Sequence, residues 1–315
     1  MRVSVKRAAG IDCGTNSIRL LVADSDEDGH LVDLHREMRV VRLGQGVDRT
    51  GQLAPEALER TRVALIDYAA IIADLGAPAV RMVATSATRD AANRGDFVNM
   101  VQAVLGVEPE VISGHEEAAL SFAGAVAGLP GVNGLLLVAD IGGGSTELVL
   151  GSSHGTDSLR SFSMDVGCVR MTERHLRDDP PTAEQVSATV ADLQAALATA
   201  RAHVPFDSAA TLVGVAGTVT TIAAIALDLE AYDPDRIHGS TITIEQVEQI
   251  TARLLRMTHD QRAALPVMHP GRVDVIGGGA LVLRTLMREC QAPAVIASEH
   301  DILDGIVLSV VDVSG

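Results

Sequence analysis

Two stretches of the chain share one pattern: a short apolar run leads into a polar, glycine-containing turn, and a second apolar run follows. The first stretch spans residues 9–24 and the second spans residues 137–150. Short runs rich in Leu, Ile and Val, bounded by such turns, are typical of β-strands. Each stretch therefore predicts two adjacent strands joined by a tight turn.

The remaining pattern alternates apolar runs of strand length with longer amphipathic stretches. Pro55 in a first turn and Gly76 after a last turn are typical helix boundaries, and Thr182 is a candidate N-cap for a helix toward Ala202. Further strands are predicted at residues 38–43, 79–85, 110–112, 146–151, 159–165 and 212–215, and further helices at residues 116–127, 245–257 and 302–311. The pattern indicates an α/β protein whose second half repeats the first.

The two turns also share a motif, Asp-x-Gly-x-x-Ser. It occurs at Asp12, Gly14 and Ser17 and again 128 positions later (140 minus 12), starting at Asp140. This offset is the length of a small domain, so the duplication predicts two similar domains with a polyphosphate held between them. The glycine- and proline-rich segment 128–134 separates the repeats. We accordingly expect domains at residues 1–128 and 129–315.

The second turn carries three consecutive glycines, Gly142, Gly143 and Gly144, after Asp140. Glycine permits positive φ and close approach of another group. Successive backbone N–H groups in such a turn can form an anion-binding nest. Asp140 would repel a bare phosphate, so the arrangement predicts a divalent cation between the carboxylate and the phosphate. The alternative is a tight hairpin with an incidental aspartate.

Composition and charge limit the function classes. The net charge of −16 and an aromatic content of 2% argue against nucleic-acid binding, which needs basic surface or stacking platforms. A polyanionic substrate would then need metal ions and local basic groups. Cys13, Cys168 and Cys290 have no zinc-type or paired spacing.

No part of the sequence indicates membrane insertion. Residues 1–7 lack the apolar core of a signal peptide, so we expect a cytoplasmic protein. The uncharged stretches 118–139 and 208–227 approach the length of a membrane span, but glycine, proline or threonine interrupts them. We expect both to form strand–turn–helix elements of a buried core.

Four segments resemble those of the exopolyphosphatase / guanosine pentaphosphate phosphohydrolase (Ppx/GppA) family, in its short two-domain form. They are residues 11–17 (IDCGTNS), 84–90 (ATSATRD), 112–118 (ISGHEEA) and 140–147 (DIGGGSTE). The family belongs to the actin, hexokinase and Hsp70-like superfamily. The resemblance implies two similar ribonuclease H-like domains with the active-site cleft between them. It also implies that a closing helix at about residues 301–315 packs back on the first domain.

The resemblance further implies a set of site residues. Phosphate-binding positions would be Gly14, Thr15, Asn16, Ser17, Arg19, Arg89, Gly142, Gly143, Gly144, Ser145 and Thr146. Asp140 and Glu147 would hold Mg²⁺ or Mn²⁺, with Asp12 as a third candidate ligand, and Glu147 would also assist catalysis.

Glu116 is the implied catalytic base, and Glu117 is its rival. An alternative for Glu116 is helix capping, because Ser113-x-x-Glu116 matches the capping box. Two further alternatives stay open: Arg19 packs at the base of its hairpin instead of binding substrate, and Glu147 is an ordinary strand residue.

We expect an exopolyphosphatase that removes the terminal phosphate of inorganic polyphosphate with the help of a divalent cation. The alternative substrate is guanosine pentaphosphate, hydrolysed to the tetraphosphate. A kinase of the same superfamily and a non-catalytic alarmone or nucleotide sensor are the alternatives from other classes. We expect no nucleic-acid partner and no membrane association, and the sequence leaves open whether the chain forms a homodimer.

Overall fold

The computed structural model describes residues 6–26, 31–129, 132, 134–152, 155–209 and 211–313. The chain divides into two compact units. Unit 1 contains Met1–Ala127 and Asp301–Gly315, and unit 2 contains Gly128–His300. The C-terminal segment thus returns to the unit that the N-terminal half forms. None of the helices among the described residues is long and apolar enough to cross a membrane.

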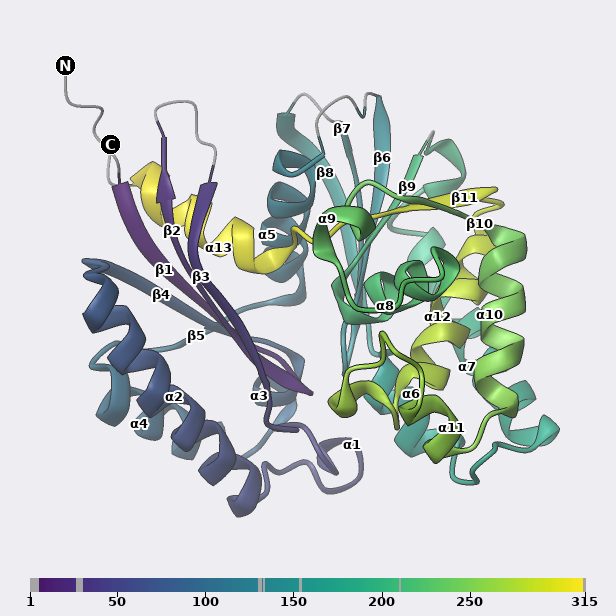
Figure 1. Ribbon diagram of the computed structural model, residues 1–315, viewed down its shortest axis with the longest axis horizontal. Coiled ribbons are helices and arrows are strands. Elements are labelled where there is room, and N and C mark those ends of the chain that lie inside the picture. The colour runs from purple at the N-terminus through teal and green to yellow at the C-terminus, as the bar shows by residue number, and fades with distance from the viewer. Residues whose placement is uncertain are drawn as a thin grey trace. The chain divides into compact units, whose positions relative to one another are not determined.

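Unit 1 is built on a five-stranded sheet with the order β3-β2-β1-β4-β5 (Figure 1). Its strands are β1 (Lys6–Cys13), β2 (Ser17–Ser25), β3 (Leu31–Val40), β4 (Ala79–Ala84) and β5 (Glu110–Val111). Strands β1, β2 and β3 are antiparallel neighbours, whereas β4 and β5 run parallel to β1. The unit's helices are α1 (Val47–Thr50), α2 (Pro55–Leu75), α3 (Ser86–Asp90), α4 (Arg94–Leu105), α5 (Gly114–Ala127) and α13 (Ile302–Val313).

Alternating side chains of β2 separate the two apolar layers of unit 1. Ile18 and Leu20 belong to the core that α2 and α4 cover, with Tyr68 and Phe97 among its largest buried side chains. The next residue, Leu21, instead packs with residues of α13. Because successive strand residues point to opposite faces, β2 supplies both layers of the unit.

Helix α13 lies against the strands of unit 1, where Figure 1 shows the yellow helix beside the purple strands. Two glycines allow it to approach α5 closely. A Cβ on Gly124 of α5 would lie 1.8 Å from the carbonyl oxygen of Asp301, and a Cβ on Gly305 would lie 2.0 Å from that of Leu120. Any side chain at either position must push the two helices apart.

We expect Gly124→Ala to destabilise the protein by about 1–3 kcal/mol, because an added methyl group in a packed interface forces backbone shifts. The matched control is Gly95→Ala, also in a helix, where the added Cβ meets nothing within 4 Å. This control should stabilise the protein by up to about 1 kcal/mol, because alanine is the better helix former. Urea unfolding of both variants measures the difference, and equal stabilities would contradict the close packing of α5 and α13.

Unit 2 is built on a six-stranded sheet with the order β10-β11-β9-β6-β7-β8. Its strands are β6 (Leu135–Ile141), β7 (Thr146–Ser152), β8 (Gly155–Met164), β9 (Thr211–Val215), β10 (Thr241–Thr243) and β11 (Ala294–Ala297). Its helices are α6 (Cys168–His175), α7 (Ala183–Arg201), α8 (Ala216–Ala226), α9 (Pro234–Ile237), α10 (Ile244–Arg256), α11 (His259–Ala263) and α12 (Ile276–Glu289), with 3₁₀ turns at Phe206–Ser208 and Pro270–Arg272. One large apolar core joins strand residues to α7, α8, α10 and α12.

Five strands of the unit 2 sheet repeat the topology of the unit 1 sheet, and β10 is an additional antiparallel strand at its edge. In unit 2, β6, β7 and β8 are antiparallel neighbours, and β9 runs parallel to β6, as β4 does to β1 in unit 1. Strand β11 continues in parallel beyond β9, in the position that β5 takes beyond β4. Each unit therefore has the ribonuclease H-like arrangement, which confirms the predicted α/β fold of two similar domains.

Several predicted elements are confirmed with small changes at their ends. Helix α2 begins at Pro55 and ends before Gly76, which adopts φ 65°. Helix α7 begins after Thr182, whose hydroxyl and Gln185 form a capping box. The strand predicted at residues 38–43 is wrong in position, since β3 covers Leu31–Val40 and pairs with β2 throughout.

Candidate active site

The two duplicated turns form the same local structure. The Gly14 amide donates to the Ser17 carbonyl at 3.0 Å, and the Gly142 amide donates to the Ser145 carbonyl at the same distance, 3.0 Å. Each turn joins the first two antiparallel strands of its sheet. The sequence repeat is therefore also a structural repeat, with one copy in each unit.

In unit 2, the carbonyl groups of the turn point toward the start of α6. Gly142 O accepts from the Cys168 amide, and Gly143 O accepts from the Val169 amide, both at 2.9 Å. Because a trans peptide directs its C=O and the following N–H to opposite sides, the amides of Gly143 and Gly144 point away from α6. This arrangement supports an anion-binding nest.

In these turns, glycine allows other groups to pack close to the backbone and does not provide a positive φ. Gly142 does not adopt the left-handed conformation that the sequence interpretation allowed for the run of three glycines, and neither does Gly14 of the first turn. A Cβ on Gly142 would lie 3.2 Å from Ser145 O, and a Cβ on the neighbouring Gly167 would lie 2.5 Å from Gly143 O. The second turn is thus packed tightly against the residue that precedes α6.

In unit 1, the loop after β3 takes the place that α6 has in unit 2. Thr15 O accepts from the Gly44 amide at 2.9 Å, and Asn16 O accepts from the amides of Val41 at 3.1 Å and Arg42 at 2.8 Å. By the same argument, the amides of Asn16 and Ser17 point away from this loop. The Thr15 hydroxyl also pairs with Ser86 Oγ at 3.0 Å, so the start of α3 adjoins the turn.

The duplicated turns differ two residues after the serine. In unit 1, Asp12 on β1 lies opposite Arg19 on β2. In unit 2, Asp140 on β6 lies opposite Glu147 on β7. Directly opposite residues of antiparallel strands point to the same face. One copy of the motif therefore pairs its aspartate with a cation, and the other pairs it with a second carboxylate.

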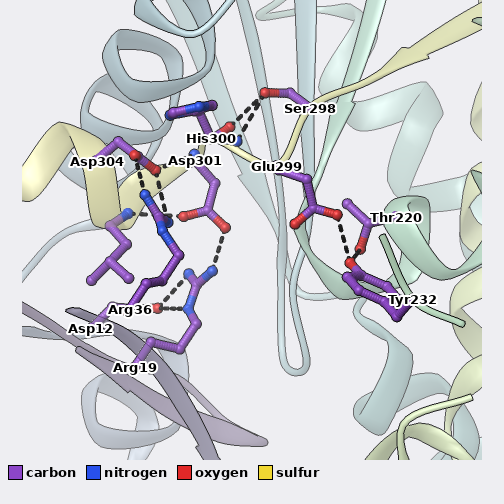
Figure 2. A network of polar contacts seen from close by, with 11 residues as sticks. Asp12, Arg19, Arg36, Thr220, Tyr232, Ser298, Glu299, His300, Asp301 and Asp304 are labelled. Atoms are coloured by element: carbon purple, nitrogen blue, oxygen red, sulfur yellow. Dashed lines mark hydrogen bonds and ion pairs between the residues drawn. The ribbon is translucent and has the colours of Figure 1, made fainter. Parts of the chain in front are cut away.

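The Asp12 carboxylate belongs to an ion-pair network in unit 1 (Figure 2). Its Oδ2 accepts from Arg19 Nε at 3.0 Å and from a terminal guanidinium nitrogen at 2.6 Å, and Arg19 also pairs with Asp301. Burial raises the pKa of Asp12, while Arg19 acts in the opposite direction. Asp12 Oδ1 is buried without a hydrogen-bond partner among the described residues, so it can still accept from a water or substrate group.

The same network holds the first turn of α13. Asp304 pairs with Arg36 of β3, and its carboxylate accepts from the Asp301 amide at 2.9 Å (Figure 2). Arg19 therefore joins the β1–β2 hairpin to α13. This arrangement favours a packing role for Arg19 over the phosphate-binding role, which the sequence left as alternatives.

Asp140 and Glu147 form a pair of carboxylates in unit 2. Their residues are 6% and 1% exposed, and Glu147 Oε1 accepts from Ser163 Oγ at 2.7 Å. Two carboxylates on one buried face repel each other unless a cation or proton intervenes. Hard oxygen ligands of this kind suit Mg²⁺ or Mn²⁺. The pair therefore fits a divalent cation.

Within the described parts of the chain, no three His, Cys, Asp or Glu side chains lie close enough together to hold a metal ion. Mg²⁺ is commonly bound by one or two carboxylates together with substrate phosphates and water. The Asp140–Glu147 pair matches that pattern, which does not need a site made of protein ligands alone.

The two neighbouring glutamates of α5 have different surroundings. Glu116 has a side chain that is 46% exposed and accepts from Arg81 of β4 at 2.9 Å. Its amide donates to Ser113 Oγ at 3.2 Å, which is one half of the predicted capping box. The carboxylate that would complete the box contacts Arg81 instead.

Glu117 is nearly buried, with a side chain that is 8% exposed, and it accepts from Arg89 at 2.9 Å. Arg89 belongs to α3, which begins at Ser86, the residue whose hydroxyl pairs with Thr15 of the phosphate turn. Glu117 is thus connected to the turn through Arg89 and α3, whereas the Arg81 partner of Glu116 lies opposite Gly10 within the sheet.

Some predicted ligands have other roles, and one candidate was missed. Thr146 is completely buried and its hydroxyl donates to Val166 O at 2.6 Å, which favours a structural role for this hydroxyl over phosphate binding. Ser86 was not singled out, although its place in the segment ATSATRD was a usable signal.

Burial raises the pKa of Cys168, which lies beside the second turn, to about 11, so this thiol is neutral and not a nucleophile near pH 7.

Comparisons with known proteins agree with this geometry. The sequence model of the Ppx/GppA phosphatase family matches residues 21–313. The chain is 51% identical over 319 residues to "Exopolyphosphatase 2" of Mycobacterium tuberculosis, with 98% of this chain and 99% of that protein covered.

Solved structures give the same result. A crystal structure described as an exopolyphosphatase-like protein is 44% identical, with a TM-score of 0.93 and 97% of each chain covered. The Aquifex aeolicus member of the Ppx/GppA family is 28% identical, with a TM-score of 0.81 and 99% of each chain covered. With two duplicated phosphate-type turns, a paired carboxylate site and these relatives, the chain belongs to the Ppx/GppA phosphatase family.

Proposed function

We propose that this enzyme is an exopolyphosphatase, which hydrolyses the terminal phosphoanhydride of inorganic polyphosphate and releases orthophosphate. The observation that carries the proposal is the duplicated turn in which one copy, at Asp140, faces a second carboxylate, Glu147. The name of the M. tuberculosis relative, "Exopolyphosphatase 2", supports polyphosphate over guanosine pentaphosphate.

The two turns bind phosphoryl oxygens. Backbone amides of Gly143 and Gly144 in unit 2, and of Asn16 and Ser17 in unit 1, supply donors that need no reorganisation when the anion binds. The hydroxyls of Thr15, Ser17 and Ser145 are the nearby side-chain donors. Asp140 and Glu147 would hold a divalent cation, Mg²⁺ or Mn²⁺, which would offset the charge of the phosphates.

Glu117 orients the attacking water and accepts its proton. The water oxygen forms a bond to the terminal phosphorus, and the bridging oxygen leaves with the shortened chain. We prefer Glu117 to Glu116, the base first inferred from sequence, because Glu117 is buried and is connected to the phosphate turn through Arg89. Arg89 then positions the Glu117 carboxylate, so binding substrate phosphate is not its only role.

The presence of all these carboxylates disfavours the sensor alternative, since a protein that only binds the anion gains nothing from a general base. The kinase alternative requires an acceptor site with its own base. Guanosine pentaphosphate hydrolysis uses the same chemistry and is the second candidate, because the family includes enzymes for each of the two substrates.

The test measures orthophosphate release from linear polyphosphate, guanosine pentaphosphate and ATP, each with and without Mg²⁺. We expect the largest kcat/KM with polyphosphate, and no release after a chelator removes the metal. Restored activity on adding back Mg²⁺ or Mn²⁺ is the control for irreversible damage. Preference for guanosine pentaphosphate would move the substrate to the second candidate, and full activity in chelator would remove the metal from the proposal.

A further inference from the structure

The side chain of Arg170, in the first turn of α6, is bonded to the Gly142–Ser145 turn. Its Nε donates to Gly144 O at 2.6 Å, which places the guanidinium against this carbonyl. The backbone amide of Arg170 donates to Gly143 O at 3.1 Å. Arg170 therefore contacts two successive peptide groups of the turn, one through its main chain and one through its side chain.

With this contact, three consecutive carbonyl groups of the turn are fixed on the side of α6. Gly142 O and Gly143 O accept from backbone amides at the start of α6, and Gly144 O accepts from Arg170. In a trans peptide, the N–H that follows each carbonyl points to the opposite side. The amides of Gly143, Gly144 and Ser145 therefore share the side of the turn that faces away from α6.

These three amides form the donor set of the proposed phosphate site. None of them donates a hydrogen bond to another residue of the described chain, although Gly144 and Ser145 are buried. A buried N–H group without an acceptor costs free energy, so such groups are normally paired with protein, water or a ligand. A phosphate oxygen would supply the missing acceptor.

The duplicated turn of unit 1 also has its third carbonyl held in place. Asn16 occupies the position of Gly144, and its carbonyl accepts from two backbone amides of the loop after β3. In unit 2, the Arg170 side chain takes the place of those amides. The orientation of the Gly144–Ser145 peptide therefore depends on a side chain, which can be substituted without changing the backbone.

We propose that Arg170 is a positioning residue that orients the Gly144–Ser145 peptide so that its amide faces the bound phosphate. This inference rests on the proposed function. Arg170 acts from the carbonyl side of the turn and does not itself bind the phosphate. Loss of the Nε donor frees the peptide to rotate, and the Ser145 amide then leaves the set of aligned donors that binds the anion.

Two substitutions separate the Nε donor from the charge of the side chain. In Arg170→Gln, the amide nitrogen is as many bonds from Cα as Nε is in arginine, so it can still donate to Gly144 O. Arg170→Met has a similar length but no donor at this position. Both variants lack the terminal guanidinium nitrogens, so any other contact of those nitrogens is lost equally. The difference between the variants therefore measures the contact with Gly144.

We expect Arg170→Met to bind inorganic phosphate about tenfold more weakly than the wild type, because hydrogen bonds to an anion are strong and directional. The KM for polyphosphate should rise by a similar factor. Arg170→Gln should stay within about threefold of the wild type in both constants. Calorimetric titration with inorganic phosphate in saturating Mg²⁺ measures the Kd, and initial rates give the KM.

Arg174→Met is the matched control. It makes the same substitution one turn later in α6, where the guanidinium contacts Asp192 at 2.8 Å and not the turn. It should leave the phosphate Kd and the KM unchanged. Thermal unfolding scans of all variants show whether each is folded at the temperature of the titration. If Arg170→Met does not fold, Arg170→Leu takes its place, because leucine also lacks a donor.

Three results would overturn the inference. A merely structural role would lower the melting temperature of Arg170→Met and leave the phosphate Kd of the folded protein unchanged. Equal losses of affinity in Arg170→Met and Arg170→Gln would assign the effect to the charge instead of the Gly144 contact. A loss of affinity in Arg174→Met as large as that in Arg170→Met would show that the effect is not specific to the turn.

Phosphate binding also separates this inference from the proposed function. Inorganic phosphate is the product of the proposed reaction, so its binding does not depend on turnover. If the wild type releases no orthophosphate from polyphosphate, the proposed function fails. Weaker phosphate binding by Arg170→Met than by Arg170→Gln would still support the role of Arg170 in orienting the turn.

Discussion

Glu117→Gln should lower kcat for polyphosphate hydrolysis by at least about a hundredfold, because a positioned general base contributes on the order of 10²–10⁴ in rate. Glutamine can still accept the hydrogen bond that Arg89 donates to Glu117. The fold and the KM should therefore change little. Initial-rate kinetics together with a thermal unfolding scan measure both quantities.

The neighbouring variant Glu116→Gln is the matched control. Glu116 is exposed and contacts Arg81, an interaction between partly exposed charges that contributes about 0–1 kcal/mol. We expect wild-type turnover and nearly unchanged stability. A large loss of turnover in Glu116→Gln, with Glu117→Gln active, would return the role of base to Glu116.

Asp140→Asn should raise the Mg²⁺ concentration needed for half-maximal activity at least about a hundredfold. Loss of a residue that only supports a metal ligand already costs 10- to 100-fold in metal affinity, and Asp140 is proposed as a direct ligand. The neutral amide also removes the repulsion from Glu147, its cross-strand neighbour. The variant should therefore be as stable as the wild type, or more stable, in the absence of metal.

The duplicated motif supplies the control for this second prediction. Asp12→Asn makes the same substitution at the equivalent position of unit 1, where Arg19 is opposite. It should change the Mg²⁺ requirement much less, because Arg19 already neutralises this carboxylate. Titration of activity with Mg²⁺ compares the variants. Equal increases in the Mg²⁺ requirement of Asp12→Asn and Asp140→Asn would show that the difference between Arg19 and Glu147 does not decide which turn holds the metal.

Local sequence determined much of this fold. The Asp-x-Gly-x-x-Ser turns, each between two apolar runs, determined both hairpins, since strand length, period-2 burial and glycine turns are properties of neighbouring residues. Helix boundaries at Pro55, Gly76 and Thr182 followed from capping and proline chemistry. The duplicated motif by itself indicated two similar units.

Other local signals were misleading. Residues 277–279 are three consecutive glycines, a composition that by itself favours a turn. The structure contradicts this, because these glycines lie in the first turns of α12. A Cβ on Gly278 or Gly279 would lie 2.6 or 2.3 Å from a threonine of another helix, so these glycines allow helices to pack closely. Only long-range packing distinguishes that use of glycine from a turn.

The choice between adjacent residues also depended on tertiary structure. Glu116 and Glu117 are equally polar and lie next to each other, and a capping motif drew attention to the first. Burial and the contact with Arg89, 28 positions earlier in the chain, separate them. Likewise, Asp12 and Asp140 share one motif, and only their cross-strand partners, Arg19 and Glu147, distinguish them. Sequence motifs indicated where we propose that phosphate binds. Burial and pairing between distant residues distinguished the carboxylate that Arg19 neutralises from those proposed to take a cation or a proton.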